Sequence, residues 1–401
     1  MPSDTSKPGL LFTAFEPSGD DHASSVIAEL RRRYPDLPMY AWGGPKMKAA
    51  GAEVVERTGD DAVMGLPGLA KIREHGRINK RIDAWLAERG KDIALHIPVD
   101  SPAANFPICA IAKRRGLKVV HLVAPQIWAW GGWRIRKLRR LTDKVLCLLP
   151  FEETWFRERG VDAQFIGHPL FDETPSEETL AAASADLPDR DAEHRLAIMP
   201  GSRPGEIAKN FPLLLAAFRD VLKRFPGAAG MVAATTPQVE ERLKAIASEH
   251  GGWPDRLHVV NGRTDSVVHW CTIALVVSGT VTLQITRQRR PMVIFYKSSP
   301  LMYTLFARWL LSTEFFTLPN LVAGREIVPE LVPHFDGHEP IAAEAIKLLD
   351  NPALVKLQKD HLDGVAGQFA GRCAAESAAD AIASVAGLPR REPTGSPVTA
   401  S

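Results

Sequence analysis

Short runs of apolar residues alternate along most of the chain with longer stretches of mixed polarity. In the first half, these runs occupy residues 10–15, 93–99, 119–123 and 145–149. Unbroken apolar runs of about four to eight residues are typical of strands that are covered on both faces. Stretches with helical spacing, such as 23–33 and 82–89, precede or follow them. The alternation predicts a parallel sheet with helices on both sides.

The same alternation restarts after an interruption. Residues 171–194 are rich in Asp, Glu, Pro and Ala, which is typical of a surface linker, here with a short helix. Beyond the linker, apolar runs recur at residues 196–199, 230–234, 257–260, 273–277 and 292–295. Two successive sheets of this kind predict an α/β fold with two Rossmann-like, doubly wound domains that face each other across a cleft.

These boundaries divide the chain into parts. We expect an N-terminal domain over residues 1–170, then the linker, then a C-terminal domain over residues 195–370. A helix is expected over residues 371–388. The last residues, 389–401, are polar and rich in proline, so we predict that they are disordered.

Composition narrows the class of function and the compartment. The formal net charge of +2 gives the molecule as a whole no electrostatic match for nucleic acid. The four cysteines form no CxxC or His-spaced pattern, so we expect mainly buried thiols and a reducing compartment. We find neither a signal-peptide pattern nor an apolar stretch of about 18 to 20 residues, and expect a protein that is soluble or lies on a membrane surface.

No metal or other cofactor is expected from the sequence. The histidines show no HExxH motif and no paired ligand spacing. Asp189-Arg190-Asp191 has the DxD spacing with which some sugar-nucleotide enzymes hold a divalent metal. Because this triplet lies in the predicted linker, we interpret its spacing as coincidental and not as a metal site.

Two turns in the second half have the composition of an anion site. Gly201, Ser202, Arg203 and Glu206 follow the run at 196–199 and precede a predicted helix. Backbone amides at a helix start, together with a guanidinium, can hold a diphosphate without a metal. Ser278-Gly279-Thr280 follows the run at 273–277 in the same way. A tight turn with a surface arginine is the alternative, but the pair of turns favours one nucleotide site.

The first half offers an anion turn and a carboxylate. Ser18, Gly19 and Asp20 follow Glu16 and Pro17 in a turn between strand and helix, and the turn taken alone favours an ordinary helix cap by Ser18 or Asp20 over an anion site. Asp100 ends the run at 93–99, and a carboxylate at this end of a parallel strand suits a general base. On local grounds alone, a helix cap before Pro102 is the favoured explanation of Asp100.

Aromatic and basic residues cluster in one further segment. Trp128, Trp130 and Trp133 stand beside five basic residues that begin at Arg134, within residues 128–140. We interpret this segment first as a contact for a membrane or an acylated sugar, then as a solvated helix face, and only last as a nucleic-acid site. Residues 300–316 are apolar apart from Arg308 and Glu314, which fits a membrane interface or a partner subunit.

Taken in order, these motifs resemble the lipid-A-disaccharide synthase family over residues 9–385. The resemblance rests on EPSGD at 16–20, GGPKM at 43–47, VMG at 63–65, DSP at 100–102, Pro125 with WAW at 128–130, LPFE at 149–152, IGHP at 166–169, PGSRPGEI at 200–207, SGT at 278–280 and LPNLVAGR at 318–325. It implies a GT-B fold, transfer without a metal, and association with the inner face of the cytoplasmic membrane. Family members can exchange their C-terminal part between subunits, so a homodimer is implied as an option.

The resemblance also implies a reaction and residue roles. UDP-2,3-diacylglucosamine would be joined to 2,3-diacylglucosamine 1-phosphate through a β-1,6 bond, with inversion and release of UDP. Asp100 would be the general base. The acceptor side would comprise Ser18, Gly19, Asp20, Met64, Trp128, Trp130 and Arg134. The UDP side would comprise Gly201, Ser202, Arg203, Glu206, Ser278, Gly279, Thr280, Gln284, Asn320 and Arg325.

Departures from the family pattern leave alternatives open. The pattern after the base is D-x-P-x-F-N, whereas residues 100–106 read DSPAANF, which we interpret as a shift by one residue. Gln284 stands where a glutamate is expected, although an amide can still bind ribose hydroxyls. The alternatives are an altered acceptor, a UDP-sugar epimerase, and a catalytically silent UDP-binding protein at a membrane.

Overall fold

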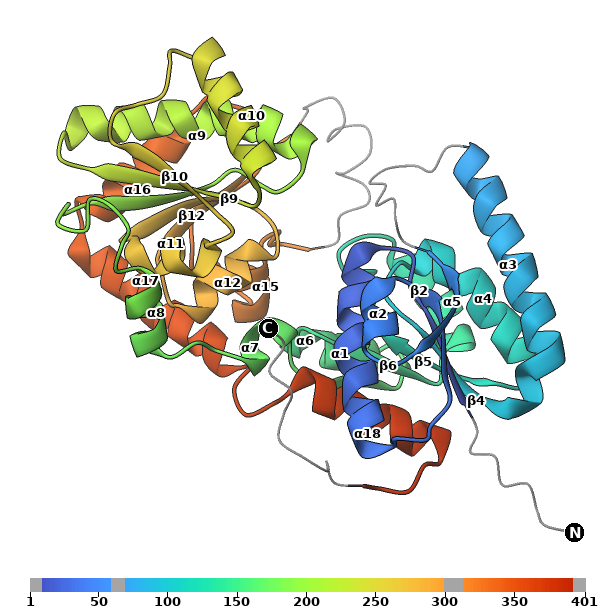
Figure 1. Cartoon of the computed structure of the whole chain (residues 1–401). Helices are drawn as coiled ribbons and strands as arrows, with labels where there is room; N and C mark the ends of the chain where they lie inside the picture. Colours follow the sequence, from blue (N-terminus) through green and yellow to red (C-terminus); the bar gives the residue numbers. More distant parts are fainter. Residues whose placement is uncertain (1–8, 59–68, 299–312, 392–401) are drawn as a thin grey trace, which may run out of the picture. The chain divides into compact units, whose positions relative to one another are not determined.

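A computed structural model describes residues 9–58, 69–298 and 313–391 of the chain (Figure 1). Residues 1–172 together with 371–401 form one compact unit, here called the N-terminal unit. Residues 173–370 form the second, the C-terminal unit. Each unit is built around its own parallel sheet.

The N-terminal unit contains a parallel sheet of seven strands among its described residues, in the order β3-β2-β1-β4-β5-β6-β7. The strands are β1 Gly9–Thr13, β2 Met39–Gly43, β3 Glu53–Arg57, β4 Ile93–Pro98, β5 Lys118–Leu122, β6 Lys144–Cys147 and β7 Ala163–Phe165. After β3 the chain crosses back and adds β4 on the other side of β1. This reversal creates a switch point between β1 and β4, where ligands bind in such sheets.

Helices cover both faces of this sheet (Figure 1). They are α1 Pro17–Arg33, α2 Pro45–Ala49, α3 Leu69–Arg89, α4 Pro102–Arg114, α5 Ile135–Leu141, α6 Pro150–Arg157, α7 Pro169–Asp172 and α18 Ala374–Ala386, with short 3-10 turns η1 Gly90–Asp92 and η2 Gly132–Arg134. The helices α1, α2 and α18 pack on one face around buried Phe12, Ile27 and Ile382. The helix α4 packs on β4 and β5, with α3 and α5 beside it.

The C-terminal unit repeats the arrangement, with six parallel strands among its described residues in the order β10-β9-β8-β11-β12-β13. The strands are β8 Arg195–Met199, β9 Ala229–Ala234, β10 Leu257–Asn261, β11 Ile273–Val277, β12 Met292–Lys297 and β13 Glu330–His334. The helices are α8 Glu177–Ala183, α9 Pro204–Arg224, α10 Pro237–Glu249, α11 Thr264–Trp270, α12 Val281–Arg287, α15 Leu318–Ala323, α16 Glu339–Leu349 and α17 Pro352–Gly367. Its switch point lies between β8 and β11.

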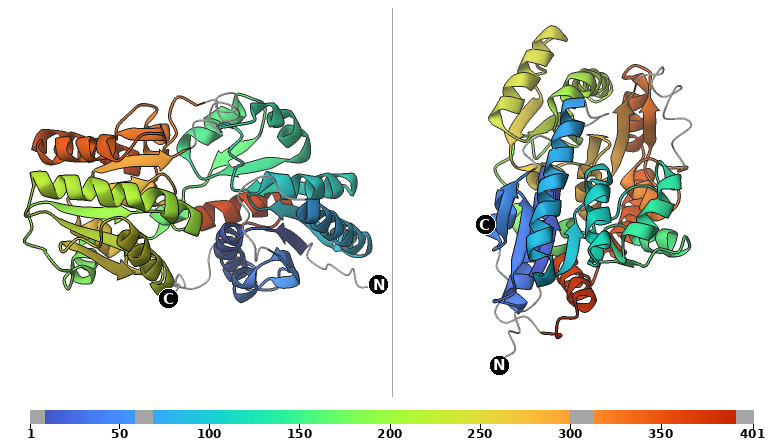
Figure 2. Two further views of the ribbon diagram at one scale, coloured as in Figure 1. Left: turned by 90° about the horizontal axis from the view of Figure 1, so that it is seen from above. Right: turned by 90° about the vertical axis from the view of Figure 1, so that its right-hand side faces the viewer.

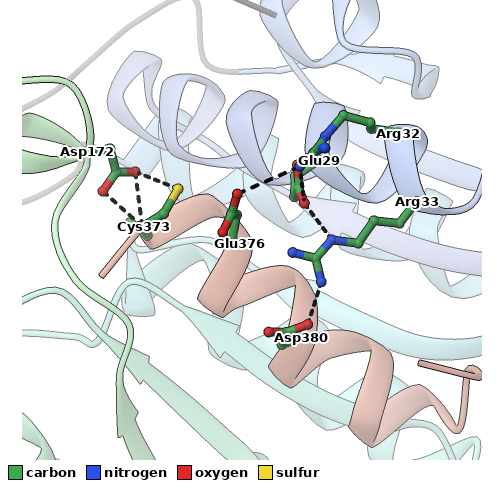
Figure 3. Close-up of polar contacts among 8 residues, drawn as sticks. Glu29, Arg32, Arg33, Asp172, Cys373, Glu376 and Asp380 are labelled. Atoms are coloured by element: carbon green, nitrogen blue, oxygen red, sulfur yellow. Dashed lines mark hydrogen bonds and ion pairs between the residues drawn. The ribbon is translucent and has the colours of Figure 1, made fainter. Parts of the chain in front are cut away.

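The C-terminal helix α18 belongs to the N-terminal unit and not to the unit that precedes it in sequence (Figure 2). Figure 3 shows the polar contacts that hold α18 against α1 and against Asp172. Arg33 of α1 pairs with Glu29 and with Asp380 of α18, and Glu29 and Arg33 are less than one tenth exposed. The carboxylate of Asp172 accepts the first helical amide, that of Ala374, at 2.9 and 3.0 Å. A helix at the far end of the chain is thereby fixed to the first one.

The structure confirms the predicted fold class. Each predicted apolar run coincides with a strand to within two residues at either end. Four strands were not predicted: β3 and β13 are only partly buried, β7 has three residues, and β2 was missed although it is mostly buried. Within the predicted linker, residues 173–194 pack with the C-terminal unit, and α8 contacts α11. In the predicted tail, residues 392–401 lie outside the described residues.

Candidate active site

The switch point of the N-terminal unit brings two acidic loops together. Glu16 follows β1, and Asp100 and Ser101 follow β4, the neighbouring strand. The hydroxyl of Ser101 donates to Oε1 of Glu16 at 2.7 Å, which ties the two loops to each other. Since ligands of doubly wound sheets bind at this place, Asp100 lies where a reacting group is expected.

Asp100 is partly buried and has an unusual backbone. Its φ is +46° and that of Ser101 is +38°, in the left-handed region that costs a residue other than glycine about 1–3 kcal/mol. The side-chain amide of Asn105 donates to the carbonyl of Asp100 at 2.9 Å. Burial, and secondly the charge of Glu16, raises the pKa of the Asp100 carboxyl above its ordinary value. A carboxylate with a raised pKa is a stronger base, as proton abstraction requires.

The interpretation of a one-residue shift after Asp100 is wrong for the asparagine. In the pattern D-x-P-x-F-N the asparagine stands five residues after the aspartate, and Asn105 stands five residues after Asp100. Only the phenylalanine, here Phe106, is displaced. The hydrogen bond from Asn105 to the backbone of Asp100 gives this spacing a structural role.

A second carboxyl group near Asp100, that of Glu152 in α6, was not predicted as a site residue. Its Oε1 accepts from the indole N–H of Trp128 at 2.8 Å, and its Oε2 accepts from the amides of Leu148 and Leu149. Burial, with a smaller contribution from the charge of Asp100, raises the pKa of Glu152 to about 7. Its place in the LPFE motif was a signal, but the sequence does not show that it is buried.

The predicted acceptor residues divide between surface and interior. Ser18 is exposed in the first turn of α1, and Gly19 lies against Ala14 and Val99. Asp20 points away from solvent, and its carboxylate accepts the amides of Gly44, Lys46 and Met47 at 3.0 to 3.1 Å. It therefore caps α2, a role that the sequence did not reveal. Met64 lies outside the described residues.

The tryptophans separate in the same way. Trp128 is 4% exposed and packs edge-on against Phe151, whereas Trp130 and Trp133 are 43% and 73% exposed. The guanidinium of Arg134 lies 4.1 Å from the ring of Trp130 and 5.4 Å from that of Trp133. Trp128 is thus part of the interior, and the other two form an exposed aromatic and cationic surface.

In the C-terminal unit, the two predicted anion turns come from neighbouring strands. One follows β8 and the other follows β11, and these strands are paired at the switch point. The first turn needs its glycine, because Gly201 has φ of +99° and an added Cβ would lie 3.1 Å from Glu206. Ser202 and Arg203 are exposed, and the guanidinium of Arg203 pairs with Glu206 at 2.8 Å. Pro204 has no N–H and the amides of Glu206 and Ile207 donate to the carbonyl of Arg203, so the turn presents a cation and the amide of Gly205 at the sheet edge.

The second turn adds hydroxyl groups beside the first. Gly279 and Thr280 are exposed, Ser278 is partly buried, and the amide of Ser278 donates to the carbonyl of Phe295 in β12. Gln284 is partly buried one turn further along α12. Hydroxyl and amide groups of this kind are suited to phosphate and ribose oxygens.

Asn320 and Arg325 have different surroundings. Asn320 is fully buried, and its amide hydrogen bonds to Val328, Glu330 and Ile327. Arg325 is exposed and follows Gly324, which has φ of +66°. Asn320 therefore braces the segment that carries Arg325.

The described residues contain no group of three or more His, Cys, Asp or Glu side chains arranged to hold a metal. In the DxD triplet, Asp189 instead accepts from Arg256 and His258. In the described part of the chain, every helix is too short or too polar to traverse a bilayer.

Comparisons with known proteins agree with this architecture. A glycotransferase of kitacinnamycin has a TM-score of 0.61 at 15% identity, over 95% of this chain and all of that chain. The UDP-GlcNAc 2-epimerase from Neisseria meningitidis, solved with UDP-GlcNAc bound, has a TM-score of 0.59 at 9% identity, over 94% of this chain and 99% of its own. At such identities these matches show the fold alone, and they confirm the GT-B class.

Comparison with related sequences identifies the family of the chain. The lipid-A-disaccharide synthase of Myxococcus xanthus (strain DK1622) is 36% identical over 341 residues, which are 85% of this chain and 88% of the relative. The model of the family described as lipid-A-disaccharide synthetase matches residues 10–382. The chain therefore belongs to the lipid-A-disaccharide synthase family, whose members are glycosyltransferases of lipid A biosynthesis.

Proposed function

We propose that the protein transfers a diacylated glucosamine from UDP to the 6-hydroxyl of a diacylated glucosamine 1-phosphate, with inversion, and releases UDP. The observation that carries this proposal is Asp100, a carboxylate with a raised pKa at the switch point of the N-terminal unit. Family membership supplies the substrate class.

In this proposal the C-terminal unit binds the donor. The turn with Gly201, Ser202 and Arg203 holds the diphosphate, and Ser278, Gly279 and Thr280 contribute further contacts. Gln284 hydrogen bonds to ribose. Glu206 orients Arg203 through their ion pair, and Asn320 acts indirectly by bracing the segment of Arg325. The UDP-GlcNAc bound in a protein of the same fold supports a UDP-sugar as donor.

The N-terminal unit binds the acceptor. Ser18 and Gly19 offer a hydroxyl and backbone groups beside Asp100, while Arg134 supplies a cation for the 1-phosphate. Asp20 and Trp128 act by holding the walls of this region, since their polar groups are engaged internally. Met64 is assigned to the acceptor from the family motif alone.

The chemistry needs one proton transfer and one displacement. Asp100 takes the proton from the acceptor 6-hydroxyl while that oxygen attacks the anomeric carbon of the donor. The bond from the anomeric carbon to the diphosphate breaks with its electron pair, which leaves on UDP. Arg203 and the amide of Gly205 at the start of α9 stabilise the negative charge that develops there.

The exposed tryptophan surface suits the membrane that holds such acylated substrates. Arg136, Arg139 and Arg140 are exposed on α5, which follows Trp130 and Trp133 in the chain, and none of the ion pairs among the described residues includes them. Exposed tryptophans and unpaired arginines favour a bilayer interface with anionic lipid. We assign this interface to the inner face of the cytoplasmic membrane. The proposal also includes a homodimer, because the family resemblance implies that the C-terminal part can be exchanged between subunits.

One incubation tests the proposal. Purified protein is mixed with labelled UDP-diacylglucosamine and diacylglucosamine 1-phosphate, and products are separated by thin-layer chromatography. Disaccharide 1-phosphate and UDP are expected in equal amounts. A free epimerised sugar in the absence of acceptor would favour an epimerase instead, and UDP binding without any turnover would favour a silent binding protein.

A further inference from the structure

Three buried polar side chains form a hydrogen-bonded cluster next to the loop of Asp100, and only one of them, Asn105, belongs to a motif named above. Thr13 ends β1, His96 lies in β4, and Asn105 lies in the second turn of α4. Each has no exposed surface. Most buried polar groups in proteins are hydrogen-bonded. Here the hydroxyl of Thr13 bonds to both His96 and Asn105, which leaves only Nδ1 of His96 without a partner in this cluster of described residues.

The direction of each hydrogen bond in this cluster follows from its chemistry. The hydroxyl of Thr13 donates its one proton to Oδ1 of Asn105 at 2.7 Å. The hydroxyl oxygen of Thr13 also lies 2.9 Å from Nε2 of His96. Because its one proton is already donated to Asn105, this oxygen must accept from His96, which therefore carries its proton on Nε2. Burial lowers the pKa of His96 to about 3, so the ring is neutral at ordinary pH. The order is therefore His96 to Thr13 to Asn105.

The chain of hydrogen bonds ends on the backbone of Asp100. With its oxygen turned to Thr13, the amide of Asn105 directs both N–H groups to carbonyls, that of Val99 at 3.0 Å and that of Asp100 at 2.9 Å. The amide of Asp100 donates to the carbonyl of Leu122 in β5 at 2.9 Å. Peptide groups on both sides of the Asp100 side chain are thus fixed from the core.

This support matters because the backbone there is strained. Asp100 and Ser101 are consecutive residues other than glycine with positive φ. Such conformations persist where surrounding contacts determine them. If the amide of Asn105 lost its present orientation, the left-handed conformation of Asp100 and Ser101 would be less stable. A change of backbone conformation there would turn the carboxylate of Asp100 in another direction.

We propose that His96, Thr13 and Asn105 are positioning residues, which together hold the backbone of Asp100 so that its carboxylate points toward the acceptor hydroxyl. The inference rests on the proposed role of Asp100 as the base. None of the three side chains contacts a substrate in this scheme, and their effect reaches the reaction only through Asp100.

The test removes the hydroxyl in the middle of the chain while keeping the shape. Thr13→Val is expected to lower kcat by about ten- to one-hundred-fold, since misplacing a reacting group by an ångström has effects of that size. The KM for the UDP-sugar should not change, and the acidic limb of the pH profile of kcat/KM should move because the carboxyl loses its present surroundings. Thr13→Ser keeps the hydroxyl and should keep both kcat and the pH profile.

A matched control and a reference variant separate the outcomes. Thr142→Val makes the same chemical change at a hydroxyl that only caps the end of α5, and it should leave kcat unaltered. If Thr13→Val does not fold by circular dichroism, Thr13→Ala replaces it. Equal losses in Thr13→Ser and Thr13→Val, or wild-type kcat and pH profile in Thr13→Val, would overturn the inference. An active Asp100→Ala protein would instead overturn the proposed role of Asp100.

Discussion

Replacing Asp20 by asparagine should destabilise the N-terminal unit without weakening substrate binding directly. The carboxylate is 6% exposed and accepts three amides at the start of α2. Asparagine keeps one oxygen for two of these amides but turns an N–H₂ group toward the third. Hydrogen bonds to charged groups contribute about 1.5–3 kcal/mol each, and neutral ones about 1, so the loss of one bond and the weakening of two should cost about 2.5–7 kcal/mol.

Urea unfolding followed by circular dichroism measures the loss, and hydrogen exchange at the amides of Gly44, Lys46 and Met47 localises it. Asp21→Asn is the matched control, because the neighbouring Asp21 is exposed and its carboxylate pairs with the exposed Lys46. That change should cost less than about 1 kcal/mol. If Asp20→Asn is as stable as the wild type but raises the KM for the acceptor, then Asp20 binds substrate and the capping argument is refuted.

Three further changes probe the charges of the site. Glu16→Gln keeps the acceptor for Ser101 but removes the charge that raises the pKa of Asp100, so the acidic limb of kcat/KM should move to lower pH; an unmoved limb would contradict this. Glu152 binds a proton more tightly in the folded state, because its pKa is about 7 there against an ordinary value of 4.5. Its contribution to the free energy of unfolding therefore falls as the pH rises from 4.5 to about 7, by at most about 1.4 kcal/mol per pH unit. Glu152→Gln should therefore flatten the pH dependence of urea unfolding between those values, and an equal slope would show that Glu152 is not the source. Arg203→Ala should weaken UDP binding by about 1.5–3 kcal/mol in calorimetry, with Arg203→Lys intermediate, and an unaltered affinity would remove Arg203 from the site.

The fold was largely predictable because apolar runs mark strands that are covered on both faces. Residues 273–277 match β11 at both ends, since five consecutive apolar residues allow few other structures. The edge strand β3, with sequence EVVER, is half exposed and carries three charges, so its sequence resembles a loop. The docking of α18 on α1 depends on Arg33 and Asp380, which are 347 residues apart and carry no local signal.

The candidate site was predictable where position along a strand decides it. Asp100 and Arg203 each follow an apolar run, and both lie at a switch point, although the role of Asp100 as a base was predicted only through the resemblance to the family. Roles that depend on distant partners were not predictable. The capping of α2 by Asp20 and the burial of Glu152 against Trp128 join segments that only folding brings together. Thr13 and His96 did offer a signal, since each is a polar residue within an apolar strand.

The role of Asp100 is tested most directly by single-turnover transfer in Asp100→Asn, a variant of equal size that cannot accept the proton. With enzyme in excess and both sugar substrates saturating, the rate of disaccharide formation should fall by about 10²- to 10⁴-fold, the range expected for loss of a general base. The affinity for UDP should stay at the wild-type value. Transfer at the wild-type rate in this variant would contradict the account.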